Sequence, residues 1–483
     1  MYKAMLRSHN GGAKVRVAGI YPQCTIDSNV SIRSCFIEPL GLGKVLAVAT
    51  KGGCDVMYAM PIRESLDEMI ARIERFDPDV VALSLMTCQM PAGRHVADRL
   101  KEKRKDRLVL GGGYHPSVML TAEPPFDAFV FGEGEAVFHD VIGAARGGRD
   151  WTQCPGLVLS RGRTRPVERI ACLDNYPWAI RDDRMLEETY CGLIYPPVTQ
   201  QAGFAFVEYG RGCKWDCTYC CKEVIWGDTL TYRQPVDVVR EMISLQETKK
   251  VNLFFFADLN FTSSASHVLA LCQEMKRQAF TGSWFCMSNV ATATNDVLDA
   301  MAAAGCVKIM YGIESVEGST LRRIHKGGSY AKEKRVVQAT LDLGMLPHLF
   351  YMVGFPWETP GTMRAATALL DELPGLQLRI GIATPLPGSA WFNEIKGNLT
   401  TKDWNLFDCE HLVYSHPHFD RRSIEAAVRF VYNSFYQADG YRRRVESFLG
   451  KFPRYQRSFG EFFDLLRESG YNTPGNDLQL EGS

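Results

Sequence analysis

Short apolar segments alternate with amphipathic segments in two series along this chain, and that alternation limits the folds open to it. The apolar segments of the first series lie at 15–20, 54–59, 79–86, 107–110 and 126–131. Between them the apolar residues repeat at helical spacing, as in the stretch 64–76. Strands that alternate with helices predict an α/β fold, here a doubly wound, Rossmann-like parallel sheet over residues 1–146.

A second series of the same kind follows a stretch, 147–202, in which the periodicity fades apart from a hairpin-like turn at 161–163. Its apolar segments lie at 205–209, 251–257, 283–287, 307–312, 347–353 and 377–382. Six strand–helix steps predict a partial (β/α)6 barrel over residues 203–402, with the reactive residues at the carboxyl ends of the strands. Residues 147–202 are then expected to be a connecting segment, and residues 403–483 a small C-terminal helical region.

The charge of the chain is balanced, which argues against partners that bind through a basic surface. Lys and Arg together number 55, and Asp and Glu also number 55. We therefore expect neither a nucleic acid nor an anionic membrane as partner. No apolar run reaches the roughly 18 residues of a membrane span, and most of the fifteen cysteines are scattered singly. These features predict a cytoplasmic protein with reduced thiols and no disulfide framework.

Three cysteines interrupt the start of the second series. The stretch Gly210-Arg211-Gly212-Cys213-Lys214-Trp215-Asp216-Cys217-Thr218-Tyr219-Cys220 has the spacing CxxxCxxC and follows an apolar strand. Three thiolates at this uneven spacing suit an iron–sulfur cluster in which one iron has no protein ligand. A structural zinc site would require a fourth ligand, for which Cys221 is the nearest candidate, and three ordinary core thiols are the remaining alternative.

The cysteine stretch resembles that of the radical S-adenosylmethionine (radical SAM) superfamily. The resemblance extends over most of the chain. Three further stretches match: Phe256-Ala257-Asp258, Tyr311-Gly312-Ile313-Glu314-Ser315, and Gly354-Phe355-Pro356-Trp357-Glu358-Thr359. The resemblance implies that Cys213, Cys217 and Cys220 hold a 4Fe-4S cluster whose free iron chelates S-adenosylmethionine. Reduction of that sulfonium by one electron would release a 5′-deoxyadenosyl radical.

The same resemblance assigns expected neighbours to S-adenosylmethionine. Tyr219 would pack near the adenine, and Ser288 and Asn289 stand where the family contacts the ribose. Asp258 is expected near the methionine amino group, and Glu314 is a second polar candidate, unless it only satisfies backbone N–H groups at a helix start. Arg211 is either a counter-charge to the methionine carboxylate or to the cluster, or a solvated loop charge.

The N-terminal region is similar to the cobalamin-binding radical SAM enzymes. The resemblance rests on Glu38-Pro39-Leu40-Gly41-Leu42, Ser84-Leu85-Met86-Thr87, Gly111-Gly112-Gly113-Tyr114-His115-Pro116 and Gly132-Glu133-Gly134-Glu135. It implies a cobalamin whose tail enters the sheet edge beside Ser84, Gly111, Gly112 and Gly113, because glycine lets the ligand approach the backbone closely. The cobalt-ligating DxHxxG signature is absent, since the corresponding loop reads Asp27-Ser28-Asn29-Val30-Ser31, so no histidine from that loop is expected on cobalt.

The resemblance implies a cobalamin-dependent methyltransferase that acts on an unactivated carbon of a small-molecule or natural-product intermediate. An electron donor such as a flavodoxin or ferredoxin is the expected protein partner. Ring formation, ring contraction or another rearrangement without methyl transfer is the alternative within the subgroup, and a zinc-stabilised binding protein is the alternative outside enzymes. The aromatic residues of the C-terminal region either close the space above the barrel or pack as an ordinary helix pair. No residue is assigned a catalytic role.

Overall fold

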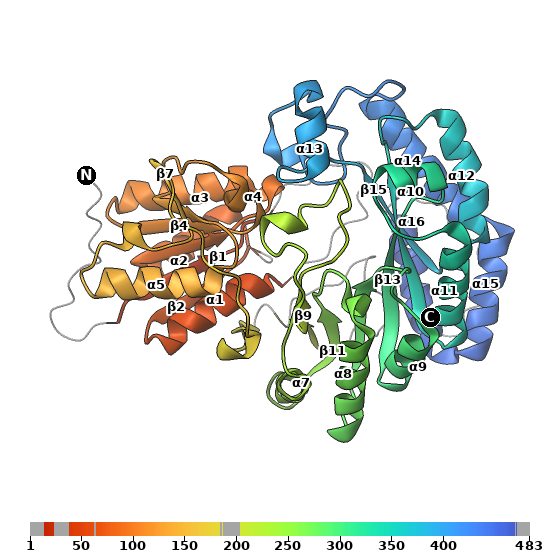
Figure 1. Ribbon diagram of the computed structural model, residues 1–483, viewed down its shortest axis with the longest axis horizontal. Helices are drawn as coiled ribbons and strands as arrows, with labels where there is room; N and C mark the ends of the chain where they lie inside the picture. The colour runs from red at the N-terminus through yellow and green to blue at the C-terminus, as the bar shows by residue number, and fades with distance from the viewer. Residues whose placement is uncertain are drawn as a thin grey trace.

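The computed structural model describes residues 14–23, 38–61, 64–183, 186, 203–468 and 470. The described residues form two α/β units, each built around one sheet. Figure 1 shows the N-terminal unit in red to yellow and the C-terminal unit in green to blue, with the cysteine-bearing segment after β9 between them.

The N-terminal sheet has the strand order β2-β1-β3-β4-β5-β6-β7, and its first five strands are parallel. They are β1 (Arg16–Ile20), β2 (Asp55–Ala59), β3 (Val80–Ser84), β4 (Leu108–Gly112) and β5 (Ala128–Val130). Strand order reverses between β1 and β3, which creates a switch point at the carboxyl edge of the sheet. The sequence-based prediction of a doubly wound sheet is confirmed.

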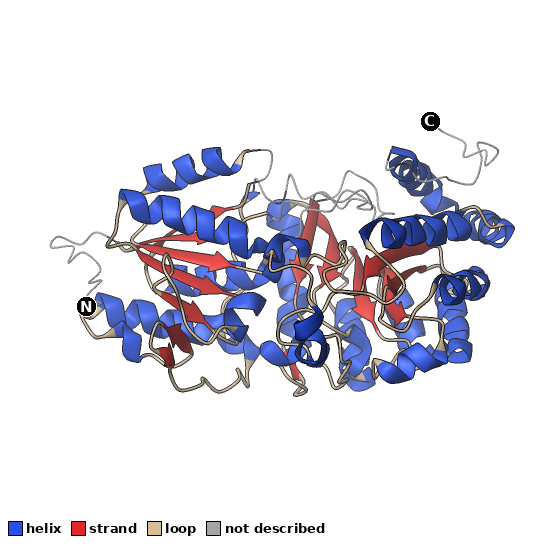
Figure 2. Ribbon diagram, turned by 90° about the horizontal axis from the view of Figure 1, so that it is seen from above, coloured by secondary structure: helices blue, strands red, loops and turns tan. Residues whose placement is uncertain are grey.

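Helices cover both faces of this sheet, as Figure 2 shows from above. The helices of the unit are α1 (Leu40–Lys51), α2 (Leu66–Phe76), α3 (Met90–Lys103), the short α4 (Tyr114–Val118) and α5 (Gly134–Arg146). Helices α1 and α5 pack together over one face, and α2 contacts α3 over the other. The predicted hairpin near 161–163 extends the sheet as β6 (Leu157–Leu159) and β7 (Gly162–Arg163), which pair antiparallel beside β5.

The C-terminal sheet is a six-stranded parallel sheet in the order β15-β14-β13-β12-β11-β8. Its strands are β8 (Gly203–Val207), β11 (Val251–Phe256), β12 (Ser283–Ser288), β13 (Cys306–Glu314), β14 (Leu346–Val353) and β15 (Gln377–Ile382). The helices around it are α7 (Pro235–Lys249), α8 (Ala265–Arg277), α9 (Asn295–Ala303), α10 (Gly318–Arg323), α11 (Tyr330–Asp342) and α12 (Pro360–Glu372). With β8 and β15 as its edges, the sheet is the partial (β/α)6 barrel that the sequence predicts.

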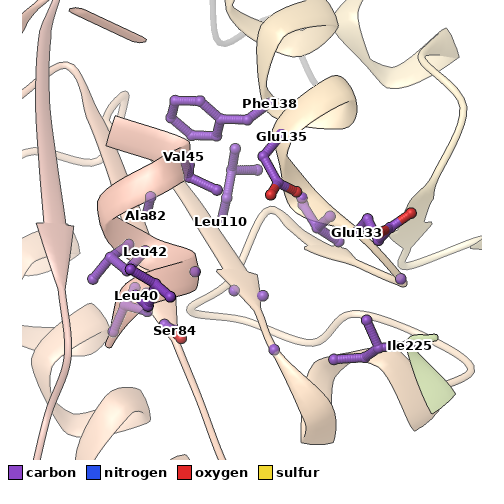
Figure 3. A pocket seen from close by; sticks show the side chains of 18 of the residues that line it. Leu40, Leu42, Val45, Ala82, Ser84, Leu110, Glu133, Glu135, Phe138 and Ile225 are labelled. Carbon is purple, nitrogen blue, oxygen red and sulfur yellow. The ribbon is translucent and has the colours of Figure 1, made fainter. Parts of the chain in front are cut away.

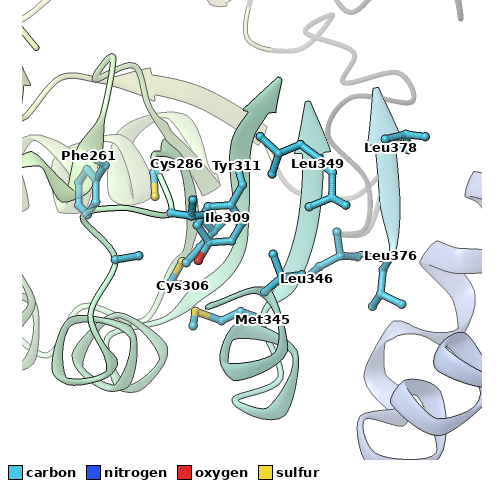
Figure 4. Close-up of a cluster of buried hydrophobic side chains, with 14 of the residues drawn as sticks. Phe261, Cys286, Cys306, Ile309, Tyr311, Met345, Leu346, Leu349, Leu376 and Leu378 are labelled. Carbon is cyan, nitrogen blue, oxygen red and sulfur yellow. The ribbon is translucent and has the colours of Figure 1, made fainter. Parts of the chain in front are cut away.

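The main core lies between this sheet and its helices, because successive side chains of a strand point to opposite faces. Figure 4 shows the outer layer, where Ile309 and Tyr311 of β13 lie beside Leu346 and Leu349. The inner face carries a second cluster of aromatic side chains: Phe204, Phe206, Phe255 and Phe285. The run Val251–Phe256 is apolar at nearly every position because both of its faces are buried.

The C-terminal helices serve the barrel as packing elements. They are α13 (Ala390–Ile395), α14 (Arg421–Tyr436), α15 (Asp439–Lys451) and α16 (Gln456–Glu468). Two hydroxyls of α14 accept hydrogen bonds from the edge of β15, with Ile380 N to Tyr432 Oη at 2.8 Å and Leu378 N to Tyr436 Oη at 2.9 Å. Side chains of a later helix thus satisfy an exposed strand edge.

Some aromatic residues of the C-terminal region pack as ordinary helix residues, and others lie near the space above the barrel. Tyr432 and Phe435 are core residues of the helical layer. Trp404 instead meets the N-terminal unit, with its ring centroid 4.9 Å from that of His115. Tyr414 lies 5.6 Å from Trp391 of α13 (ring centroids). Of these aromatic residues, Trp404 is the one whose ring contacts a ring of the N-terminal unit among the described residues.

Most of the described cysteines are free, as expected, and Cys88 is the exception among them. Eleven of them are free thiols in the described chain. Cys88 is disulfide-bonded, so the expectation that every scattered cysteine is reduced is wrong at this position. None of the described helices has the length and apolar character needed to span a bilayer.

Candidate active site

The cysteine stretch forms a loop that is closed at its base by a small antiparallel pair, β9 (Gly210–Arg211) and β10 (Thr231–Tyr232). Gly212 adopts φ +94°, and a Cβ there would lie 2.1 Å from the carbonyl oxygen of Thr229. Only glycine fits both the conformation and the space. The Gly-x-Gly that precedes Cys213 is therefore needed for the closure of the loop.

The three predicted ligands are free, half-buried thiols on this loop. Burial raises the pKa of Cys217 to about 11, the nearby Lys326 ammonium opposes this, and Cys220 and Cys213 add to the rise. The three sulfurs thus lie within electrostatic reach of one another. Among the described residues, no three His, Cys, Asp or Glu side chains converge on a single metal ion. A cubane takes each thiolate on a different iron, so this donor set fits a 4Fe-4S cluster.

A buried ion pair lies beside the cluster cysteines. Glu314 ends β13 with φ +58°, and its Oε1 lies 3.0 Å from Lys326 Nζ. Burial would lower the pKa of Lys326, but Glu314 and Cys217 hold it above its usual value, so the ammonium stays charged. Burial raises the pKa of Tyr219, and the Glu314 carboxylate, which accepts a hydrogen bond from this phenol, raises it further. The structure therefore brings Tyr219 and Glu314 together with Cys217.

Lys326 is not predicted from the sequence. It lies twelve positions after Glu314, between His325 and two glycines, and no local pattern distinguishes it from a solvated loop lysine. Its ammonium places a positive charge beside the three cysteines, where it would offset the negative charge of a bound cluster. Glu314 does not merely satisfy backbone N–H groups at a helix start, because its carboxylate pairs with the ammonium of Lys326.

Asp258 holds the base of the cysteine loop. Its Oδ1 accepts a hydrogen bond from Tyr209 N at 3.0 Å and its Oδ2 one from Gly210 N at 2.7 Å. Burial raises its pKa to about 7, although both backbone bonds favour the ionised form. The contact joins the end of β11 to β9. A contact of Asp258 with the methionine amino group remains a prediction.

Ser288 and Asn289 lie at the end of β12 in a separate polar cluster. Ser288 Oγ is 2.5 Å from Thr262 Oγ1, and Asn289 N donates to Asn260 Oδ1 at 3.0 Å. Asn260 Nδ2 is buried and has no hydrogen-bond partner within the described chain. A buried unpaired amide donor is costly unless a ligand satisfies it, so this cluster fits a polar group such as a ribose. Asn260 is not among the residues predicted from the sequence.

A cavity of about 230 Å³ opens at the carboxyl edge of the N-terminal sheet (Figure 3). Ser84, Gly111, Gly112 and Gly113 line it, as the resemblance implies for cobalamin. Its walls are otherwise mostly apolar: Leu40, Leu42, Val45, Ala82, Leu110, Val130 and Phe138. A Cβ built at Gly41 or at Gly132 would meet no atom within 4 Å. A narrow apolar slot with bare backbone at its mouth fits the flat tail of a corrin.

Two features bear on how cobalt would be held. The loop Asp27–Ser31 lies outside the described residues. His115 does not line the cavity, and its Nδ1 lies 3.3 Å from Thr87 Oγ1. Burial lowers its pKa to about 4, so the ring is neutral. It packs as an uncharged core histidine against Trp404.

The same cavity also borders the cysteine loop, because Arg211, Ile225 and Trp226 contribute to its lining. Arg211 is buried and spans the two units, with Nη1 to Glu133 Oε1 at 2.8 Å and Nη2 to Glu135 Oε1 at 2.5 Å. Its Nε lies 2.7 Å from Glu208 Oε1. The alternative of a solvated loop charge is therefore wrong, because three carboxylates surround the guanidinium.

Glu208 completes this junction by pairing also with Lys44 of α1. Burial alone would raise its pKa, but Arg211 and Lys44 outweigh burial and hold the pKa well below its usual range. Nearby, the ring of Tyr114 meets Trp226 edge-on at 5.7 Å. Burial raises the pKa of Tyr114, and Cys221 and Cys220 add to it. The glycine turn of the first unit thus reaches the cysteine loop of the second.

Both units match known families. Residues 34–142 match the B12 binding domain, and residues 207–370 match the radical SAM superfamily. The chain belongs to the cobalamin-binding radical SAM enzymes. Its expected cofactors, a 4Fe-4S cluster, S-adenosylmethionine and cobalamin, are those of the two families, and the zinc-stabilised binding protein is excluded.

Relatives of this combined architecture include different activities. The chain is 27% identical over 410 residues to an uncharacterized methyltransferase of Pyrococcus horikoshii, covering 82% of this chain and 87% of the relative. It is 23% identical to the anaerobic magnesium-protoporphyrin IX monomethyl ester cyclase of Rubrivivax gelatinosus, over 89% of this chain and 76% of the relative. The radical S-adenosylmethionine methyltransferase TsrM of Kitasatospora setae, solved with cobalamin and a 4Fe-4S cluster, shares the fold at a TM-score of 0.63 and 19% identity. That match covers 80% of this chain and 75% of TsrM.

Proposed function

We propose that this enzyme is a cobalamin-dependent methyltransferase that methylates an unactivated carbon of a small-molecule or natural-product intermediate. The observation that carries the proposal is the single cavity whose walls come from the glycine turn of the N-terminal unit and from Arg211, Ile225 and Trp226 of the barrel. A corrin held there faces the cysteine loop. When bound, the cluster and S-adenosylmethionine supply a radical that removes a hydrogen atom, and cobalamin supplies the methyl group.

The chain's own residues bind and position these groups in the proposed enzyme. Cys213, Cys217 and Cys220 bind the cluster, and Lys326 offsets its charge. Tyr219 and Glu314 form one wall for S-adenosylmethionine, and Ser288, Asn289 and Asn260 offer polar contacts at the ends of the neighbouring strands. Asp258 keeps the loop base in place through its two backbone bonds. Ser84 and the glycines Gly111, Gly112 and Gly113 admit the cobalamin tail.

Two further parts of the proposal concern the cellular setting. A flavodoxin or ferredoxin supplies the electron that each radical requires. The enzyme works in the cytoplasm, where a reducing environment suits a thiolate-bound cluster and eleven free cysteines.

Ring formation or rearrangement without methyl transfer is the second candidate, favoured by the name of the cyclase relative. Product analysis separates the two. We expect a product heavier by one methylene, with one S-adenosylhomocysteine and one 5′-deoxyadenosine formed per turnover. A product that has lost hydrogen, with no S-adenosylhomocysteine, would support the second candidate. Cobalamin bound per chain, measured after reconstitution with hydroxocobalamin, tests the cofactor assignment without any substrate.

A further inference from the structure

The segment 322–327, which comprises the end of α10 and the turn after it, covers the outer side of the cysteine loop. Thr218 N donates to the carbonyl oxygen of Ile324 at 3.1 Å. Cys217 Sγ lies 3.8 Å from the carbonyl oxygen of His325. The Trp215 ring lies against Gly327, where a Cβ would come within 2.1 Å of it. One side of this segment thus touches a cluster ligand, and the other side forms the surface.

That surface is basic. Arg322, Arg323 and His325 are all exposed, and Lys214 is exposed on the cysteine loop itself. Neither arginine forms an ion pair with a described residue, and the guanidinium of Arg323 lies 4.9 Å from the centroid of the Trp357 ring. The only carboxylate paired here is Asp216, whose Oδ2 is 3.5 Å from His325 Nδ1 among the described atoms. In a chain with 55 charges of each sign, this is a local excess of positive charge.

We propose that Arg322, Arg323 and His325, the basic edge formed by the end of α10 and the turn after it, dock a small acidic protein that carries one electron. The inference rests on the proposed function, because the cluster must be reduced for every radical formed. One electron passes from the reduced carrier to the oxidised cluster, and no atom is transferred. The route is short, since the backbone carbonyl oxygen of His325 lies 3.8 Å from Cys217 Sγ and the same residue is exposed at the surface. Redox complexes are small and transient, and unpaired surface charges speed their formation.

The test measures reduction of the cluster itself in the reconstituted full-length enzyme. Bleaching of its visible absorbance is followed by anaerobic stopped flow, with reduced flavodoxin or with reduced methyl viologen, a small cation, as donor. We expect Arg322→Glu/Arg323→Glu to slow reduction by flavodoxin about ten-fold or more at low salt. The same variant should be reduced by methyl viologen at the wild-type rate or faster.

The matched control is Lys250→Glu/Lys276→Glu, which makes the same change of charge. Both lysines are exposed, at the ends of α7 and α8 that precede strands, opposite the cysteine loop. This control should leave both rates unchanged. The neutral variant Arg322→Gln/Arg323→Gln should fall between wild type and the charge reversal, and added salt should slow the wild type toward the charge-reversed variant.

Three results would overturn the proposal: flavodoxin reduces the charge-reversed variant normally, the control is slowed equally, or the variant loses its response to both donors. Dimerisation of the wild type through this edge, abolished by the same variant, would identify a second copy as the occupant instead. The readout needs no substrate. The two proposals can therefore fail separately. If reduction by flavodoxin is salt-sensitive but the product gains no methyl group, the docking surface is upheld and the methyltransferase proposal is refuted.

Discussion

Arg211 and Glu133 join the two α/β units through a buried ion pair with 2.8 Å between Nη1 and Oε1. Arg211 stands two positions before Cys213, and Glu133 borders the apolar cavity of the N-terminal unit. One side chain therefore links the loop proposed to hold the cluster to the unit that matches the B12 binding domain. The pair is 78 positions apart in the chain.

We expect Arg211→Met to weaken this junction strongly. It leaves Glu133, Glu135 and Glu208 buried without their cation, which costs about 3–5 kcal/mol for a broken buried pair. Limited proteolysis should cut the variant faster between the units, and less cobalamin should be retained. Arg99→Met is the control, because its exposed pair with Asp67 is worth at most about 1 kcal/mol. Equal proteolysis of the two variants would contradict the role of Arg211.

Cys217→Ala should abolish cluster assembly, because two thiolates cannot replace three ligands to three irons. Iron and sulfide per chain should fall to near zero, and 5′-deoxyadenosine should no longer form. Cys172→Ala removes an exposed free thiol elsewhere and should leave both quantities unchanged. Normal iron content in Cys217→Ala would count against the ligand assignment.

Gly41→Leu should close the cobalamin slot without unfolding the protein. The position lies in α1 and lines the cavity, and a Cβ there meets no atom within 4 Å. Helix propensity favours the change by about 0.5–1 kcal/mol, while overfilling the slot should cost about 1–3 kcal/mol of binding. Hydroxocobalamin titration should show an affinity lowered about ten-fold or more.

The control for the slot is Gly143→Leu. Gly143 lies in α5, is exposed, does not line the cavity, and also has no atom within 4 Å of its built Cβ. Both variants should be at least as stable as the wild type toward urea. Cobalamin affinity that falls equally in both would mean that the slot is not the binding site.

Tyr432→Phe should destabilise the barrel. It removes the acceptor for Ile380 N, and a buried donor left unpaired costs about 1–3 kcal/mol. Tyr436→Phe should destabilise the barrel in the same way, because Tyr436 Oη accepts from Leu378 N and also donates to Leu378 O at 3.1 Å. The urea midpoint of the barrel transition measures both effects. Unchanged midpoints would show that water satisfies this edge equally well.

His115 should make stability fall in mild acid. Burial lowers its pKa from 6.5 to about 4, so below pH 6.5 the unfolded chain binds a proton that the folded chain does not. This contribution is complete above pH 6.5, and about 2 kcal/mol of it is lost between pH 7 and pH 5. His115→Phe should flatten the difference in urea stability between these two pH values. An unaltered pH dependence would mean that the ring takes up its proton in the folded state.

The periodicity of apolar residues was sufficient to predict both sheets and the positions of most helices, because one face of each element is buried. The cysteine spacing and the glycines at 111–113 likewise pointed to the correct ends of strands. The short helix Ala390–Ile395 and the helix Gln456–Glu468 were not found, since neither is separated from its surroundings by a clear change in pattern.

What the sequence could not reveal are partners brought together only by folding. Glu133 and Glu135 were visible in the glycine-rich motif, but their pairing with Arg211 depends on how the two units meet. Asp258 was expected to face a ligand, yet both of its oxygens accept backbone hydrogen bonds. Asn260 is significant because its amide nitrogen has an empty hydrogen-bond position among the described residues, and Lys326 because it lies near the thiols. Neither property can be predicted from the spacing of residues in the sequence.

The tyrosine contacts along β15 have a consequence for biosynthesis. The strand ends at Ile382, but the side chains that cover its edge come from residues 432 and 436. A growing chain must therefore add some fifty more residues while that edge can still pair with another nascent chain. Slow translation of this interval would prolong the exposure, so pausing there should raise the fraction of newly made protein that misassembles.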